Sequence, residues 1–371
     1  MKWSLYLGKL FGIKLFVHWT FSLLIAWIVY MNIKQGLGTM DIFWSLGFIF
    51  SVFACLTMHE LGHALTAKRF GVNTQDIILL PIGGMARLES IPEIPRQELL
   101  VAIAGPIVNI LIAGVLYLFL LLTDGWPNLA EFTVINSQNF LYMLFTVNLV
   151  LAGFNLIPAF PMDGGRMLRA ILSMRLNRPL ATRIAAFIGQ ALAIGFAIVG
   201  LFSNPFLVVI GIVIFLGAQS EANFTEAKYF LKGYTINNVL MHQFETLSVD
   251  DPISKAIKVI LNGQAKDFIV MDNDVVAGSL SRDEIIKALY EKDQHIQVKE
   301  VMNRKLKYLK PTDSLETLFQ MMQSKQLNIM PVIEGDKLVG VVDSENLIEF
   351  IMITQAQKNG IVYNEPDQVK E

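Results

Sequence analysis

Residues 184–220 include no charged side chain, and most of them are Leu, Ile, Val, Phe, Ala or Gly. A helix needs about 20 apolar residues to cross a bilayer, so this run is too long for a single crossing. Ser203, Asn204 and Pro205 interrupt the run with residues that are typical of a tight turn. The run therefore predicts two membrane-spanning helices joined by a short turn.

Four more apolar stretches precede this pair, at residues 15–33, 42–67, 99–123 and 140–158. Hydrophobic residues make up 53% of the 371-residue chain and charged residues 17%, whereas roughly a quarter of a soluble protein is charged. The deficit of charge is confined to the part of the chain before Glu221. We therefore expect an α-helical polytopic membrane protein with six transmembrane helices, followed by a soluble α/β domain.

Basic residues predict how these helices are oriented, because cytoplasmic loops of membrane proteins are enriched in Lys and Arg. If the N-terminus lies inside, the outer loops contain a single basic residue, Lys34. The inner segments then contain Lys2, Lys9, Lys14, Lys68, Arg69, Arg87, Arg96, Arg166, Arg169, Arg175, Arg178, Arg183, Lys228 and Lys232. Both termini and the soluble domain are therefore expected in the cytoplasm.

Residues 77–88, between the second and third predicted helices, are too short and too interrupted to cross the bilayer. Gly83 and Gly84 separate two short apolar runs there, which predicts a small β hairpin at the membrane interface. The free edge of such a hairpin can pair with an extended peptide. A hairpin that only packs on the helices explains the pattern equally well.

His59, Glu60 and His63 stand near the end of the second apolar stretch. Residues four apart on a helix share a face, so both imidazoles can reach one zinc ion. Glu60 is suited to act as the general base on a zinc-bound water. Catalytic zinc sites usually take a third protein ligand. The single cysteine, Cys55, excludes a Cys-based site.

Asp163 is the candidate for this third ligand, because it is the only acidic residue between Glu131 and Glu221. Isolated carboxylates at membrane depth are costly and usually functional. A surface turn would explain Asp163 if it stood alone. Asp163 is, however, predicted to lie at the same depth in the membrane as His59 and His63, and this favours its role as a zinc ligand.

Asn155 lies eight residues before Asp163, inside the fourth apolar stretch. Its amide could donate a hydrogen bond to the oxyanion that forms from a scissile carbonyl. Asn109 and Asn148 are further amides within apolar stretches, and contact between helices is the usual role of such residues.

Three segments of the membrane half, at residues 59–63, 104–109 and 155–164, carry a resemblance to a known family. They resemble the signature regions of the site-2 proteases, which are intramembrane zinc metalloproteases, in the bacterial and archaeal branch with a cytoplasmic regulatory tail. The resemblance implies one zinc ion held by His59, His63 and Asp163, with Glu60 as base and Asn155 as a substrate-stabilising amide.

The resemblance also implies partners and a location. The expected substrate of this regulated intramembrane proteolysis is a single-span membrane protein, such as an anti-sigma factor, a membrane-tethered transcription regulator or a remnant signal peptide. The expected location is a bacterial or archaeal cell membrane. The lipid bilayer is then a partner, and direct contact with nucleic acid is not expected.

The chain after residue 234 contains an internal repeat, in which Asp251 and Gly278 recur at one spacing as Asp313 and Gly340. Each unit reads as a helix, two β runs and a second helix, and such duplication suggests two units that bury a shared face. It resembles a tandem CBS pair, a module that often binds adenine nucleotides. The predicted domains are residues 1–225, a linker at 226–234, a CBS pair at 235–354 (units 235–292 and 297–354) and a polar tail at 355–371.

The CBS resemblance places a hydroxyl and an acidic residue at the usual ligand positions. The first unit has Ser281 and Glu284 there, and the second has Asp343 and Asn346. Neither unit matches both positions, so adenine nucleotide binding and a purely structural or homodimerising pair both stay open.

Two other interpretations of the whole chain are alternatives to a protease. A CBS-regulated transporter or channel would predict repeated halves in the membrane part, and the sequence shows none. A structural zinc site or a chance motif would require the pairing of His59, Glu60 and His63 to be accidental, although the chain contains only five His.

Overall fold

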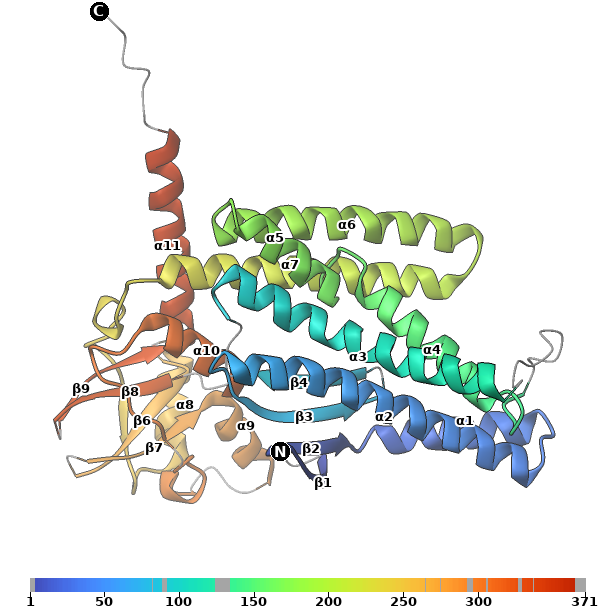
Figure 1. The fold of residues 1–371 in the computed structure, drawn as a ribbon. Coiled ribbons are helices and arrows are strands. Elements are labelled where there is room, and N and C mark those ends of the chain that lie inside the picture. Colours follow the sequence, from blue (N-terminus) through green and yellow to red (C-terminus); the bar gives the residue numbers. More distant parts are fainter. Residues whose placement is uncertain are drawn as a thin grey trace, which may run out of the picture. The chain divides into compact units, whose positions relative to one another are not determined.

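The computed structural model describes residues 4–81, 83–88, 92–123, 134–263, 265–273, 275–291, 296–304, 306–325, 329–335 and 337–363. The chain forms two compact units, Met1–Thr225 and Glu226–Glu371. The N-terminal unit is mainly helical and the C-terminal unit mixes helices with short strands (Figure 1).

The N-terminal unit is built on helices that pack side by side. Helix α2 packs against α1 and α3, and α3 also packs against α4 and α5 (Figure 1). The helices are α1 (Phe21–Lys34), α2 (Thr39–Arg69), α3 (Pro95–Leu122), α4 (Phe140–Asn155), α5 (Asp163–Ser173), α6 (Arg178–Phe202) and α7 (Pro205–Leu231).

Four of these helices, α2, α3, α6 and α7, are long and apolar enough to cross a membrane. Helices α1 and α4 are apolar but shorter, at 14 and 16 residues. The α6–α7 pair confirms the predicted break at Ser203. A helical domain with apolar spans is therefore confirmed, while the number of crossings stays a prediction.

The first predicted span begins too early. Residues 15–18 belong to a β-strand, and helix α1 begins only at Phe21. Leu15 and Ile13 are buried in a core that includes Phe53 and Ile77. A short apolar run of this kind cannot be assigned to strand or helix by hydrophobicity alone, which explains the error.

The hairpin predicted around Gly83 and Gly84 exists, within a larger sheet than the sequence indicated. The sheet has the order β1-β2-β3-β4, with β2 and β3 parallel and the outer pairs antiparallel. Its strands β3 and β4 contact α2. The strands are β1 (Ser4–Leu10), β2 (Ile13–His18), β3 (Thr74–Leu80) and β4 (Gly83–Leu88).

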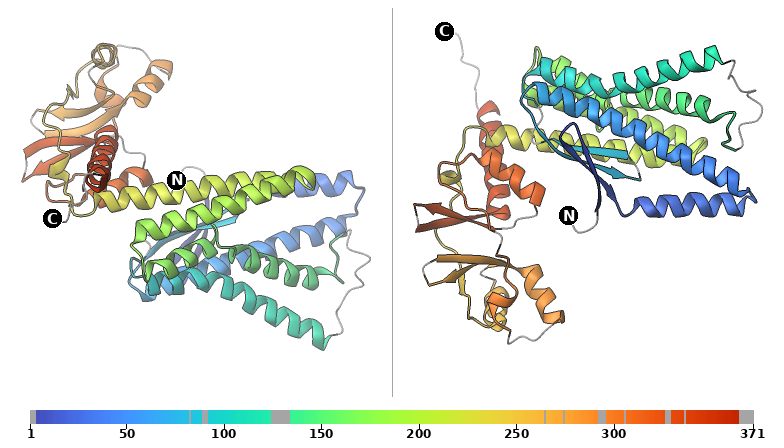
Figure 2. Two further views of the ribbon diagram at one scale, coloured as in Figure 1. Left: turned by 90° about the horizontal axis from the view of Figure 1, so that it is seen from above. Right: turned by 60° about the horizontal axis from the view of Figure 1, so that its bottom comes forward.

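The C-terminal unit contains two antiparallel strand pairs with helices beside them (Figure 2). This is the predicted order of helix, two strands and helix in each repeat. The elements are β5 (Thr246–Ser248), α8 (Ile253–Leu261), β6 (Asp267–Asp272), β7 (Val275–Ser281), α9 (Arg282–Glu291), α10 (Leu315–Lys325), β8 (Ile329–Glu334), β9 (Lys337–Asp343) and α11 (Ser344–Tyr363).

Two of the predicted boundaries of this unit fall within helices. Residues 226–231, assigned to a linker, are the last turns of α7, and residues 355–363 of the predicted polar tail continue α11. Residues 364–371 lie outside the described part of the chain.

Candidate metal centre

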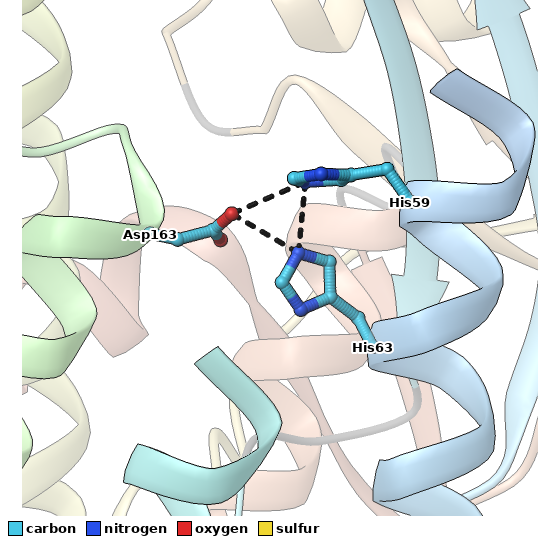
Figure 3. A group of neighbouring side chains, drawn as sticks. All are labelled: His59, His63 and Asp163. Atoms are coloured by element: carbon cyan, nitrogen blue, oxygen red, sulfur yellow. Dashed lines mark hydrogen bonds and ion pairs between the residues drawn. The ribbon is translucent and has the colours of Figure 1, made fainter. Parts of the chain in front are cut away.

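His59, His63 and Asp163 converge in the core of the N-terminal unit (Figure 3). Both histidines lie on α2, and Asp163 is the first residue of α5. The Nε2 atoms of His59 and His63 are 3.1 Å apart, and Asp163 Oδ2 lies 3.2 Å from the first and 3.1 Å from the second. All three side chains are buried. The structure thus brings together the three residues predicted to be ligands.

The outer nitrogen of each imidazole is held by a protein acceptor. His63 Nδ1 donates to the carbonyl oxygen of Val101 at 2.7 Å, and His59 Nδ1 lies 2.8 Å from Asn109 Oδ1. A proton on Nδ1 leaves the Nε2 lone pair free. Two such lone pairs and a carboxylate oxygen then face one another, which is the donor set of a tetrahedral zinc site with a position left for substrate or water. These residues therefore fit a zinc ion.

Helix α3 provides this environment through one stripe of residues. Val101, Gly105 and Asn109 follow each other at intervals of four and so share a face of the helix. A Cβ atom at Gly105 would lie 2.2 Å from His63 Nε2 and 2.6 Å from His59 Nε2. Any side chain at position 105 would therefore collide with both imidazoles at the atoms that face Asp163.

The loop before α5 brings Asp163 to this position. Phe160 is buried in that loop, and the two residues after Asp163 are glycines that lie against the loop backbone. A Cβ at Gly164 would come within 2.2 Å of the carbonyl oxygen of Ile157. Only glycine fits at position 164 without displacing this backbone, so the pair allows the loop to fold closely against the start of α5 at Asp163.

Glu60 is half-buried directly after His59 on α2. Strand β4 packs against its side chain, since a Cβ at Gly84 would lie 2.9 Å from Glu60 Cγ and 3.5 Å from Glu60 Oε1. The carboxyl group of Glu60 therefore lies between the helix that carries the histidines and the edge strand of the sheet.

Asn155 is not among the converging residues. It is the last residue of α4, and its side-chain amide donates to the carbonyl oxygen of Leu151 in the same helix at 2.9 Å. The amide that does contact the cluster is Asn109, which the sequence indicated only as a contact between helices. Its spacing from Gly105 and Val101 was the available signal, but it becomes informative only once α3 is known to face α2.

Replacing Asn109 with alanine is expected to weaken zinc binding about 10–100-fold, as loss of a partner that orients a ligand usually does. Loss of Asn109 Oδ1 removes the acceptor that holds Nδ1 of His59 and so fixes the orientation and the tautomer of its ring. Asn109→Asp keeps an oxygen at that position and is expected to retain most of the affinity. Competition with a chromogenic chelator measures both variants. Equal affinity of Asn109→Ala and wild type would contradict the role.

The chain matches the model of peptidase family M50 over residues 47–133 and 127–202, and the CBS domain model over residues 236–291 and 298–353. It is 32% identical to a zinc metalloprotease of Methanocaldococcus jannaschii, over 96% of this chain and 99% of that protein. A candidate zinc metalloprotease of Synechocystis is 27% identical over 94% of this chain and 96% of its own. The site-2 protease structure from Methanocaldococcus jannaschii is 40% identical, with a TM-score of 0.44, and covers 59% of this chain and 95% of that one. The chain belongs to peptidase family M50, the site-2 protease family, and carries a CBS domain pair.

Proposed function

We propose that the protein is an intramembrane endopeptidase that hydrolyses a peptide bond within the membrane-spanning segment of a single-span membrane protein. The observation that carries this proposal is the convergence of His59, His63 and Asp163 inside a bundle of apolar helices. A zinc site for hydrolysis has little use at that depth unless its substrate lies there too. Membership of a metalloprotease family argues against the rival interpretation as a transporter or channel.

His59, His63 and Asp163 would hold one zinc ion per chain, which acts as a Lewis acid toward water and toward a carbonyl oxygen. Glu60 would accept a proton from the attacking water at its carboxylate and return it to the nitrogen of the departing amine. The Nδ1 contacts to Val101 and Asn109 keep both imidazoles in orientation throughout. The chain therefore contributes ligands, their orientation and a proton carrier.

Strand β4 is suited to receive the substrate. It is the last strand of the four-stranded sheet, so its outer edge has no partner strand within the described part of the chain. An extended segment can add to such an edge through backbone hydrogen bonds. Because Gly84 of this strand lies against Glu60, a segment paired there would pass close to the base. A membrane helix would have to unwind before it could bind in this way.

The proposed location is a bacterial or archaeal cell membrane, with both termini in the cytoplasm. The distribution of Lys and Arg supports this orientation. His59 lies late in α2, which would run toward the cytoplasm, so water would reach the site from that side. Anti-sigma factors, membrane-tethered transcription regulators and remnant signal peptides remain the proposed substrate classes.

Purified full-length protein in liposomes, mixed with single-span candidate substrates, tests the proposal. Mass spectrometry of the products should locate the cut inside the membrane segment, and a zinc chelator should stop the reaction. Cuts confined to soluble segments would overturn the intramembrane assignment. Zinc-loaded protein that cuts none of the substrate classes would overturn the substrate assignment.

Replacing Asn155 with alanine is expected to lower kcat by about 10²–10³-fold, the usual cost of removing one donor to an oxyanion. Zinc affinity should not change, because Asn155 bonds to its own helix rather than to a ligand. Turnover and chelator competition on one preparation measure both quantities. Unchanged kcat would remove Asn155 from the proposed mechanism.

The CBS pair is expected not to bind adenine nucleotides, because the side chains at the usual ligand positions bond within the protein. The Ser281 hydroxyl donates to Glu284 Oε2 at 3.0 Å, in a cap at the start of α9. In the second unit, Asp343 Oδ1 accepts from the Asn346 backbone N–H, and Asn346 Nδ2 donates to the Val239 carbonyl. Isothermal titration of the full-length protein with ATP and AMP should give no saturable heat. Saturable heat with either nucleotide would contradict this expectation.

A further inference from the structure

A second cluster of buried charged residues lies beside the loop that precedes Asp163. Arg169, on α5, donates from Nε to Glu98 Oε1 at 2.7 Å and from Nη1 to Glu221 Oε1 at 2.5 Å. Glu98 is on α3 and Glu221 is on α7. Arg169 and Glu98 are each only 1% exposed. One guanidinium thus joins three helices of the N-terminal unit.

A second arginine shares one of these carboxylates. Arg178, at the start of α6, places Nη2 at 2.9 Å from Glu98 Oε2. It is partly exposed, and α6 carries no residue of the metal centre. Two arginines and two glutamates balance in charge. Both arginines bind Glu98, but Arg169 connects α5 to it and Arg178 connects α6.

The two helices that Arg169 and Glu98 connect are those that complete the metal centre around α2. Asp163 begins α5, the helix of Arg169. Val101, whose carbonyl oxygen holds His63, lies one turn after Glu98 on α3. The guanidinium carbon of Arg169 also lies 5.1 Å from the centroid of the Phe160 ring, in the loop that precedes Asp163. Arg169 therefore links helix α5, which begins at Asp163, to the loop that precedes this third ligand.

The energetics of buried ion pairs favour a role for Arg169 in fixing the positions of the helices over a role in stabilising the fold. A buried ion pair loses hydration energy, and apolar residues of similar volume often serve stability as well or better. A bidentate guanidinium does fix the relative position of the groups that it bridges. A metal site needs such fixed positions, since its ligands must be held within about 0.5 Å of their working geometry.

We propose that Arg169 is a positioning residue for the metal centre. By bridging Glu98 and Glu221, it sets α5 against α3, so that the Asp163 carboxylate reaches His59 and His63. The inference rests on the metal binding in the proposed function. It adds that the third ligand depends on a guanidinium outside the ligand set.

The test is Arg169→Lys in the full-length protein in detergent. Lysine keeps the charge but lacks the planar fork that pairs with two carboxylates at once. Zinc affinity, measured by chelator competition, is expected to fall about tenfold, at the lower end of losses for residues that support ligands. The visible absorption of the Co²⁺-substituted variant should also shift, because the position of Asp163 changes. A purely structural role would lower the yield of folded protein but leave affinity and spectrum unchanged.

Arg178→Lys is the matched control, because it makes the same substitution at the other arginine bound to Glu98. It should retain wild-type zinc affinity and spectrum. If folded Arg169→Lys binds Zn²⁺ like wild type, the inference is wrong. If Arg169→Lys does not fold, Glu98→Gln replaces it, with the same tenfold loss expected. Wild-type affinity in Glu98→Gln, or failure of both variants to fold, would overturn the inference. Wild-type protein that binds no zinc would instead refute the proposed metal centre.

Discussion

Replacing Gly105 with alanine is expected to abolish zinc binding and, with it, peptide hydrolysis. The added methyl carbon would lie 2.2 Å from His63 Nε2 and 2.6 Å from His59 Nε2. Real side-chain contacts between carbon and nitrogen do not approach this closely, so either the imidazoles rotate away or α3 moves back. Rotation breaks the bonds from Nδ1 to Val101 and Asn109, and withdrawal of α3 removes those acceptors from both rings. Each response destroys the donor set.

The same helix offers a matched control in Gly114, where an added Cβ would meet no atom within 4 Å. Gly114→Ala should bind zinc normally, and helix propensity should stabilise it by about 0.5–1 kcal/mol. Zinc content per chain, measured by atomic emission after gel filtration, separates the two variants. A Gly105→Ala protein that carries one zinc per chain would show that zinc binding does not require glycine at position 105.

The sequence was most informative where chemistry imposes a spacing. His59 and His63 could be paired because four residues make about one helical turn, and Asp163 stood out as a lone carboxylate in a long uncharged region. These three residues do converge in the structure. The residues that surround and orient these ligands could not be predicted in the same way. Gly105 and Asn109 matter because α3 packs against α2, and their spacing becomes informative only once that contact is known.

Arg169 illustrates a different limit. In the sequence it counted only as one of several basic residues that favour a cytoplasmic location. In the structure it is buried between Glu98 and Glu221, at positions 71 and 52 residues away along the chain. Hydropathy weighs each charge alone and cannot detect that such residues neutralise one another. The strand at residues 13–18 was misread for a related reason, because its apolar side chains are buried by a sheet built from distant segments.

Replacing Glu60 with glutamine is expected to lower kcat by about 10⁴-fold, the upper range for loss of a general acid–base group. Glutamine matches glutamate in shape, so the packing of Gly84 against the Cγ atom should persist, but an amide cannot accept a proton from water at neutral pH. Zinc content should equal that of wild type, because Glu60 is not one of the three converging donors.

A single-span substrate in liposomes gives the turnover of wild type and Glu60→Gln, and metal analysis of the same samples gives their zinc content. Glu300→Gln makes the same substitution at an exposed position of the C-terminal unit and should cleave at the wild-type rate. Loss of both zinc and activity in Glu60→Gln would mean that the carboxylate supports the metal centre. Normal turnover would mean that another group carries the proton. Only loss of turnover with full zinc content assigns Glu60 as the base, because the proton step is then the one property that the substitution removes.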